Sequence, residues 1–242
     1  MRALLLSLAI GTIGCATSHS TRADVHTFVR HYNNAHVLPG SRGYVMVDAG
    51  LESDGPTLAK DLERRGLDPS ALEVIVLTHA HADHAGGARF FQQKYGTRII
   101  VGRGDLAMLR RGTNDTLCPT DATARRRLED DQATTFTPTR ADVVVDGTLD
   151  LSTVSSATGT VHAISGHTEG SLVVVSGSRA FVGDLFRGSI VGNKAERHFY
   201  MCDLDDNDAD IRAFLRGPAS GVDTFFTGHF GPLDRAAVEK RF

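Results

Sequence analysis

Short runs of apolar, largely β-branched residues recur along the chain and dominate its pattern. The clearest is EVIVLT at 73–78, whose lack of polar alternation is typical of a strand buried on both faces of a sheet. Similar runs, each ended by turn residues, predict further strands at 25–30, 34–37, 44–48, 98–101, 142–146, 148–152, 160–164, 171–176, 179–183 and 222–227.

Helical spacing separates several of these runs. Leu58, Ala59 and Leu62 fall on one face of a helix predicted at 56–66, and Gly66 ends the pattern. Further helices are expected at 88–95, 105–111, 208–216 and 235–240. The alternation of strands with α/β units predicts an α/β fold in which two sheets pack together, with helices on the outer faces.

Residues 112–140 are the least patterned part of the chain, with two prolines and many Thr and Asp residues. We expect a partly helical excursion over the rim of the sheets. Long connections of this kind often carry substrate contacts.

The first residues differ in character from the rest. Arg2 precedes a mostly apolar stretch at 3–14 that is too short to span a bilayer, which is typical of an export signal. We therefore assign 1–15 to the signal, 16–24 to a flexible polar lead, and 25–242 to a single domain. The protein is expected outside the cytoplasm, in the periplasm or cell envelope.

The tetrapeptide Thr-Ile-Gly-Cys at 12–15 resembles the lipobox of bacterial lipoproteins, except that Thr12 stands where leucine is usual. The resemblance implies cleavage before Cys15 and a lipid anchor to the membrane through that residue. An ordinary cleaved signal is the alternative. Cys118 and Cys202 then remain, and in an oxidising compartment they either pair or stay as single buried cysteines.

Charge is balanced, with 26 Lys and Arg against 29 Asp and Glu, for a formal net charge of -3. The basic residues form no stripe, because acidic residues at 129–131 closely follow the densest run at 125–127. A nucleic-acid partner is therefore not expected.

Ligand-type side chains are crowded into LTHAHADHAGG at 77–87. His79 and His81 stand two apart at the end of a strand, where such residues point to the same side. Asp83 and His84 follow in the next turn and can face back toward the same point. Imidazole and carboxylate groups are the usual ligands of zinc and iron, so this cluster predicts a metal site.

Three further candidates follow predicted strands elsewhere in the chain. His167 lies between two strand runs, Asp184 follows the strand at 179–183, and His229 follows the strand at 222–227. A buried carboxylate such as Asp184 needs a partner. Together with the first cluster, these residues indicate one shared site.

The sequence His-X-His-X-Asp-His at 79–84 is the signature of the metallo-β-lactamase fold superfamily of metallo-hydrolases. Most of the chain resembles this family, through NAHVLPGSRGYVMVDAG at 34–50, GHTEGS at 166–171, FVGDLF at 181–186 and TGH at 227–229. The resemblance implies a four-layer αβ/βα sandwich of two mixed sheets.

The resemblance also implies two divalent metal ions, zinc first, with iron or manganese as alternatives. One ion would be held by His79, His81 and His167, the other by Asp83, His84 and His229, with Asp184 bridging both. A metal-bound hydroxide would then attack a small-molecule substrate. Asp83 would orient that hydroxide or receive a proton.

The aspartate at 184 resembles that of glyoxalase-two-like thioesterases, lactonases and related phosphodiesterases. β-Lactamases of this superfamily typically have cysteine or serine at this point. We therefore expect cleavage of an ester, thioester, lactone or related bond rather than of a β-lactam. The alternatives are a β-lactam hydrolase, an iron-dependent persulfide dioxygenase and a non-enzymatic binding lipoprotein of the envelope.

The segment after Asp184 also carries polar residues that could bind a substrate anion. These residues, Arg187, Lys194, His198 and Tyr200, belong to the stretch 187–202, which we predict to be a variable loop. We interpret them as ordinary loop residues and leave them out of the site.

Overall fold

The computed structural model describes residues 25–242, which form two six-stranded sheets and a small hairpin. The predicted signal at 1–15, including Cys15, and the lead at 16–24 lie outside the described residues. Within residues 25–242, no helix is long and apolar enough to cross a membrane.

The first sheet contains antiparallel strands at one edge and parallel strands toward the other. Its strands stand in chain order: β1 (His26–Arg30), β2 (Asn33–Pro39), β3 (Tyr44–Val47), β4 (Leu72–Val76), β5 (Arg98–Gly102) and β6 (Val143–Val145).

The second sheet is antiparallel except where β10 and β13 pair in parallel. Its spatial order is β14 (Leu233–Asp234), β13 (Thr224–Thr227), β10 (Arg179–Gly183), β9 (Leu172–Ser176), β8 (Thr160–Ala163) and β7 (Thr148–Asp150). Both sheets are therefore mixed, as predicted.

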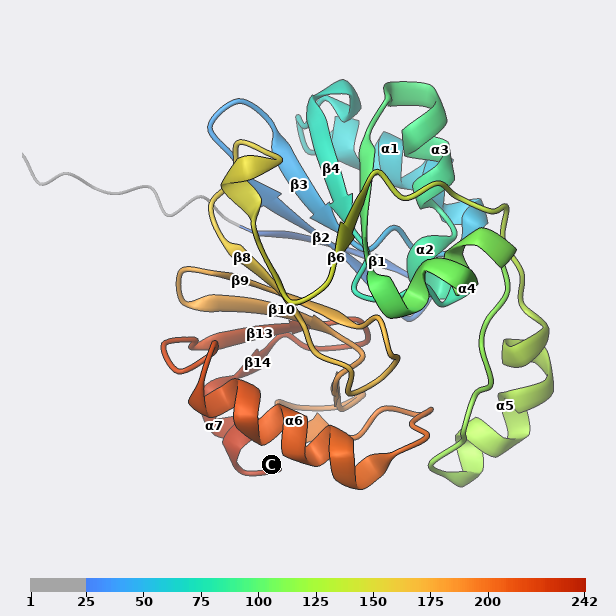
Figure 1. Cartoon of the computed structure of the whole chain (residues 1–242), viewed down its shortest axis with the longest axis vertical. Helices are drawn as coiled ribbons and strands as arrows, with labels where there is room; N and C mark the ends of the chain where they lie inside the picture. Colours follow the sequence, from blue (N-terminus) through green and yellow to red (C-terminus); the bar gives the residue numbers. More distant parts are fainter. Residues whose placement is uncertain (1–24) are drawn as a thin grey trace, which may run out of the picture.

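Helices cover the outer faces of both sheets, so the molecule has four layers (Figure 1). The helices are α1 (Gly55–Arg64), α2 (Ala82–Ala85), α3 (Ala88–Tyr95), α4 (Leu106–Arg111), α5 (Ala122–Ala133), α6 (Leu204–Arg216) and α7 (Arg235–Glu239). The first sheet carries α1 and α3, while α6 and α7 lie beneath the second. The predicted αβ/βα sandwich is confirmed.

Alternation along the strands explains the layers. On β3, Val45 and Val47 belong to the core between the two sheets, whereas Tyr44 and Met46 belong to the core under α1 and α3. Successive side chains point to opposite faces, so a continuous apolar run is what a strand covered on both sides requires.

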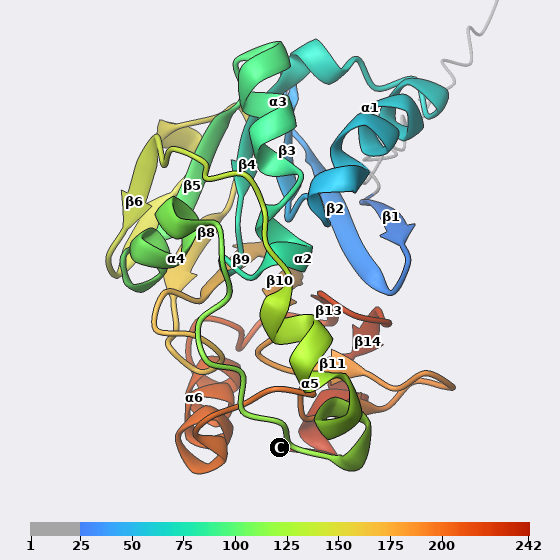
Figure 2. The same cartoon turned by 90° about the vertical axis from the view of Figure 1, so that its right-hand side faces the viewer.

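The predicted excursion at 112–140 contains α5 and stands at one end of the sandwich. Figure 1 shows α5 at the right-hand edge of the sheets, and Figure 2, viewed from that side, shows it in front of them. A disulfide joins Cys118 to Cys202 and so ties the excursion to the chain that precedes α6. Pairing, one of the two possibilities left open above, is thus what the structure shows.

Several predicted boundaries are wrong. The helix predicted at 208–216 begins at Leu204, because the Asp203 side chain accepts a hydrogen bond from the Asp206 backbone N–H and caps it. The strand predicted at 148–152 ends at Asp150 and continues as a 3-10 turn. Two very short strands, β11 (Arg187–Gly188) and β12 (Ala195–Glu196), form a hairpin that no run of apolar residues marks.

Candidate metal centre

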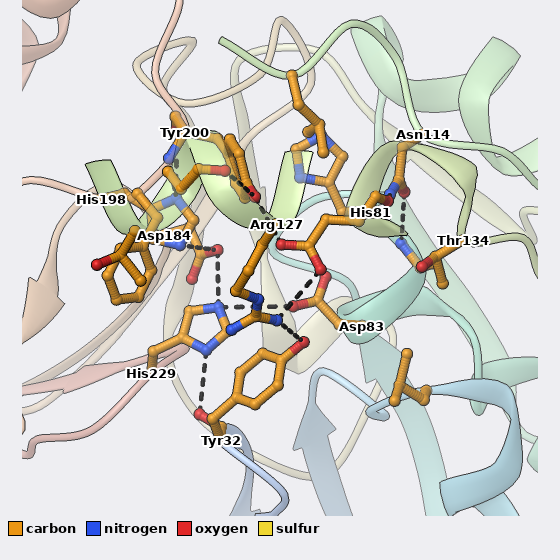
Figure 3. Close-up of a pocket in the computed structure, with 17 residues that line it drawn as sticks. Tyr32, His81, Asp83, Asn114, Arg127, Thr134, Asp184, His198, Tyr200 and His229 are labelled. Carbon is orange, nitrogen blue, oxygen red and sulfur yellow. Dashed lines mark hydrogen bonds and ion pairs between the residues drawn. The ribbon is translucent and has the colours of Figure 1, made fainter. Parts of the chain in front are cut away.

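All seven predicted site residues converge at one end of the sandwich, where strands of both sheets finish. His79 and His81 follow β4, and Asp83 and His84 belong to the short helix α2. His167, Asp184 and His229 follow β8, β10 and β13 in the second sheet. Figure 3 shows His81, Asp83, Asp184 and His229 pointing toward one cavity.

Three imidazoles form the first group of potential ligands, His79, His81 and His167, whose ligand atoms lie within 4.8 Å of one another. Within this group, His167 Nε2 lies 3.2 Å from His81 Nδ1. Asp83, His84 and His229 form the second group, with His84 Nε2 at 3.4 Å from His229 Nε2.

One carboxylate oxygen lies between the two groups. Asp184 Oδ2 is 3.1 Å from His229 Nε2 and 3.3 Å from His84 Nε2. The same oxygen is 3.7 Å from His79 Nε2 and 3.9 Å from His167 Nε2. An oxygen at this position can contact ions held by either group.

These distances fit metal ligands better than hydrogen bonds. Four ligands in a tetrahedron around zinc stand about 3.4 Å apart, given zinc–nitrogen bonds of about 2.1 Å. In addition, His79 Nε2 and Asp184 Oδ1 are buried and have no hydrogen-bond partner among the described residues. Buried polar atoms without partners are rare, and a cation bound between the two groups would give both of these atoms a partner.

Burial holds the first group in the form that binds metal. Desolvation lowers the pKa of His79 and His167 well below the usual range, and it lowers the pKa of His81 to about 4. Each of the three is therefore neutral at physiological pH, as an imidazole ligand must be.

The second group differs because carboxylates surround it. Burial by itself lowers the pKa of His84 and of His229, but nearby carboxylates, Asp184 foremost, outweigh it and raise both values. Burial alone would raise the pKa of Asp184, but neighbouring imidazoles lower it well below its usual range. Metal binding here competes with protons for these two imidazoles.

Hydrogen bonds from outside the site orient several of its rings. Asp48, which adopts a positive φ of 63°, lies with Oδ2 at 2.9 Å from His84 Nδ1 and accepts a hydrogen bond from the Thr78 backbone N–H. The Tyr32 carbonyl accepts from His229 Nδ1 at 3.0 Å. Both contacts leave the Nε2 atoms facing the centre, as partners behind a metal ligand do.

A second buried carboxylate joins the two loops that carry the first group. Asp105 accepts hydrogen bonds from the Ala80 backbone N–H, the Thr168 hydroxyl and the Gly170 backbone N–H. It therefore fixes the turn after β4 relative to the loop after β8.

The chain approaches the centre closely at Gly228. A Cβ at this position would stand 2.3 Å from Asp184 Oδ1 and 2.6 Å from His84 Cε1. Only glycine leaves room for both side chains.

Residues 29–229 match the family model described as the metallo-beta-lactamase superfamily. The chain belongs to this superfamily. The family prediction and the predicted class of metal-dependent hydrolase are both confirmed.

Solved structures of superfamily members share the fold. A metallo-beta-lactamase with a HARLDQ motif from Cronobacter sakazakii has 20% identity and a TM-score of 0.62, over 85% of this chain and 77% of that one. The metallo-beta-lactamase SMB-1, in complex with mercaptoacetic acid, has 21% identity and a TM-score of 0.62, over 85% of this chain and 76% of that one. BJP-1, a subclass B3 metallo-beta-lactamase of Bradyrhizobium japonicum, has 20% identity and a TM-score of 0.60, over 85% of this chain and 74% of that one.

Sequence reasoning missed one histidine of this candidate site. His198 was interpreted as a loop residue, but its Nε2 atom lies 2.9 Å from Asp184 Oδ2 and its side chain is buried. Lys194, by contrast, is exposed. The Arg187 guanidinium lies over the Phe199 ring, with Cζ 4.0 Å from the ring centroid. No strand-end signal precedes His198, so only the folded chain reveals its position.

An open cavity lies over the centre. Its outer wall comes from α5 and the segment before α6. On α5, Arg127 donates hydrogen bonds to the Tyr32 hydroxyl and to Asp131, and Asp131 also accepts from the Tyr200 hydroxyl. The guanidinium charge is therefore already balanced within the wall (Figure 3).

Proposed function

We propose that the chain is an exported hydrolase that uses two divalent cations, zinc foremost, to cleave an ester, a thioester or a lactone. The observation that carries this proposal is the position of Asp184 Oδ2 between two groups of three ligand-type side chains. In the proposed site, His79, His81 and His167 hold one cation and Asp83, His84 and His229 hold the second. Asp184 bridges the two.

Two bound divalent cations supply an acidified water at neutral pH and a positive charge that polarises the scissile group. The protein supplies orientation. Asp83 is the most exposed of the proposed ligands and faces the cavity, with Oδ2 3.6 Å from His229 Nε2. In this position its carboxylate can orient the attacking water and accept its proton.

The cavity supports a small-molecule substrate, because it opens over the cluster of potential ligands and is lined by both polar and apolar side chains. Its wall combines the balanced Arg127–Asp131 pair with the apolar side chains of Leu51, Leu117 and Phe199. Such a lining suits an uncharged acyl chain or ring beside the reacting bond.

The disulfide supports the export part of the proposal. Bridges such as Cys118–Cys202 persist in oxidising compartments and are rare in the cytosol. With the apolar start of the chain, this favours the periplasm or cell envelope. A lipid anchor at Cys15 is part of the same proposal.

β-Lactam hydrolysis is the second candidate, because the similar solved structures are metallo-beta-lactamases. Asp184 argues against it, since by resemblance this residue belongs to the thioesterase and lactonase branch. A panel assay decides between these candidates.

The zinc-loaded mature protein should be tested on a lactone, a glutathione thioester, an aryl ester, a phosphodiester and a β-lactam. We expect turnover of the lactone, thioester or ester. The Asp83→Ala variant should lose at least a hundredfold in kcat/KM, and the control Asp146→Ala, which changes an exposed carboxylate, should match the parent. Equal rates for parent and Asp83→Ala on every substrate would favour the non-enzymatic alternative, whereas oxygen uptake with a persulfide would favour the dioxygenase.

A further inference from the structure

A single pair of opposite charges stands in the outer wall of the cavity. Among the described residues that line this cavity, Arg127 is the only lysine or arginine. It belongs to α5, and its Nη2 atom lies 3.1 Å from Oδ1 of Asp131, one helical turn later. The one cationic side chain of the lining is therefore already in contact with a carboxylate before any substrate enters.

Tyr32 holds Arg127 in this pairing. The same Nη2 atom donates a hydrogen bond to the Tyr32 hydroxyl at 2.8 Å, and the guanidinium lies over the Tyr32 ring, with Cζ 4.7 Å from the ring centroid. Figure 3 shows Arg127 pointing toward Tyr32, beside Asp83. An Arg127 side chain that turned toward a substrate anion would have to give up all of these contacts.

Asp131 is fixed from the other side. The Tyr200 hydroxyl, which also lies 3.2 Å from the Ala124 carbonyl, donates to Asp131 Oδ2 at 2.6 Å. The Asn114 side chain then joins Asp131 to α2, because its Nδ2 donates to the Asp131 carbonyl at 2.8 Å and its Oδ1 accepts from the Ala82 backbone N–H at 2.8 Å. The charge pair therefore has a fixed position relative to the helix that carries two of the proposed ligands.

We propose that the Arg127–Asp131 pair determines specificity, by admitting substrates with an uncharged acyl group and rejecting those whose acyl group carries a carboxylate. This inference rests on the proposed function and names the substrate class of the same site. A carboxylate that entered the cavity would lose water, find no free cation in the lining and meet the charge of Asp131. An uncharged chain loses nothing of this kind and gains apolar contacts with Leu117 and Phe199. Arg127 faces the substrate, and Asp131 is the positioning residue that keeps its charge balanced.

The opposite role is that Arg127 exchanges Asp131 for a substrate carboxylate and so binds anionic substrates. The two roles predict opposite charge preferences. Substrates that differ only in one charge therefore distinguish between them.

The test uses two para-nitrophenyl esters of equal chain length, the hexanoate and the adipate half ester, which ends in a carboxylate. For the zinc-loaded parent we expect a kcat/KM at least tenfold higher on the hexanoate. Asp131→Asn removes the negative charge and should reduce this ratio at least fivefold, whereas Arg127→Gln leaves Asp131 unbalanced and should increase the ratio. The control Asp130→Asn makes the same change at an exposed neighbour on α5 and should keep the ratio of the parent.

Several outcomes would overturn the proposal. A parent that prefers the adipate ester supports the opposite role, and an Asp131→Asn variant with the ratio of the parent removes the role of that charge. A merely structural effect would lower kcat/KM on both esters alike and leave the ratio unchanged. If Asp131→Asn does not fold, Arg127→Gln still decides, because a ratio that does not increase contradicts the proposal.

A binding arm separates this inference from the proposed function. Hydroxamates bind zinc without turnover, so calorimetry can compare hexanohydroxamate with the adipate monohydroxamate on the same four zinc-loaded proteins. We expect the parent to bind the uncharged chain at least tenfold more tightly, and Asp131→Asn to lose most of this preference. Equal affinities in the parent, or no binding of either compound, contradict the role of the pair. If the parent shows the binding preference but hydrolyses nothing in the panel, only the proposed function fails.

Discussion

Removing the disulfide by the double substitution Cys118→Ser and Cys202→Ser is expected to destabilise the fold strongly. The bridge joins positions 84 residues apart in the sequence and ties the α5 excursion to the segment that carries His198. Without it, the unfolded chain regains the freedom of a long loop, while the folded chain keeps the hydrogen bonds and the apolar contacts between these segments.

The sequence separation sets the size of the effect. For a closed loop of this length, the chain-entropy relation gives a loss of about 4.5 kcal/mol in the free energy of unfolding at 25 °C. Engineered and native bridges often deliver less than this limit, so about 2–4 kcal/mol is the expected range. For a domain of this size, each kcal/mol shifts Tm by about 2–4 °C, so Tm should fall by about 5–15 °C.

Thermal and urea unfolding of the zinc-loaded protein, followed by circular dichroism, would measure this loss. The matched control is the parent protein reduced with dithiothreitol under denaturing conditions and refolded in reductant, which should have the same Tm as the double variant. A Tm within about 2 °C of the oxidised parent would refute the reasoning, because the bridge would then constrain little of the unfolded ensemble.

Three further predictions concern residues around the centre. Gly228→Ala should lower zinc affinity by at least tenfold in a chelator competition, because the new Cβ would lie within 2.6 Å of Asp184 and His84 atoms. The control Gly221→Ala should match the parent, because no atom lies within 4 Å of the position of its new Cβ. Asp48→Asn should weaken zinc binding by about 10–100-fold in the same competition, because it disturbs the carboxylate that orients His84; unchanged affinity would contradict this. Burial lowers the pKa of His36 from 6.5 to about 4, so the folded state resists protonation more than the unfolded state does. Above pH 6.5, His36 is neutral in both states and does not lower the free energy of unfolding. As the pH drops from 6.5 toward 4, the unfolded state binds this proton first, so the free energy of unfolding falls, by about 2–3 kcal/mol at pH 4.5. Urea unfolding of the zinc-free protein at pH 7.5 and 4.5 measures this drop in the free energy of unfolding. The drop should be smaller by this amount in His36→Asn than in the parent, and equal drops would contradict the role of His36.

The architecture could be predicted because its causes are local. Val45, Val47 and their neighbours on β3 form a continuous apolar run, and such a run specifies a strand covered on both faces. The spacing of His79 to His84 likewise defines one half of the site within a single turn. The second half was predicted from strand-end positions of His167 and His229, and from resemblance, rather than from spacing.

The parts that were missed depend on contacts between distant segments. His198 reaches the centre because Thr120, 78 residues earlier, binds its carbonyl and a disulfide holds the same segment. Short strands such as β11 and β12 exist through pairing alone, and no periodicity can develop over two residues. The start of α6 depends on the cap at Asp203 rather than on apolar spacing.

The central claim is that two cations lie on either side of Asp184, each held by one group of three side chains. A crystal structure of the zinc-loaded protein, with anomalous diffraction recorded at the zinc edge, tests it most directly. We predict two anomalous peaks about 3.5–4 Å apart, as in other two-metal sites, with Asp184 Oδ2 between them. No peak at this position, or a single peak contacted by only one of the two groups, would contradict the account.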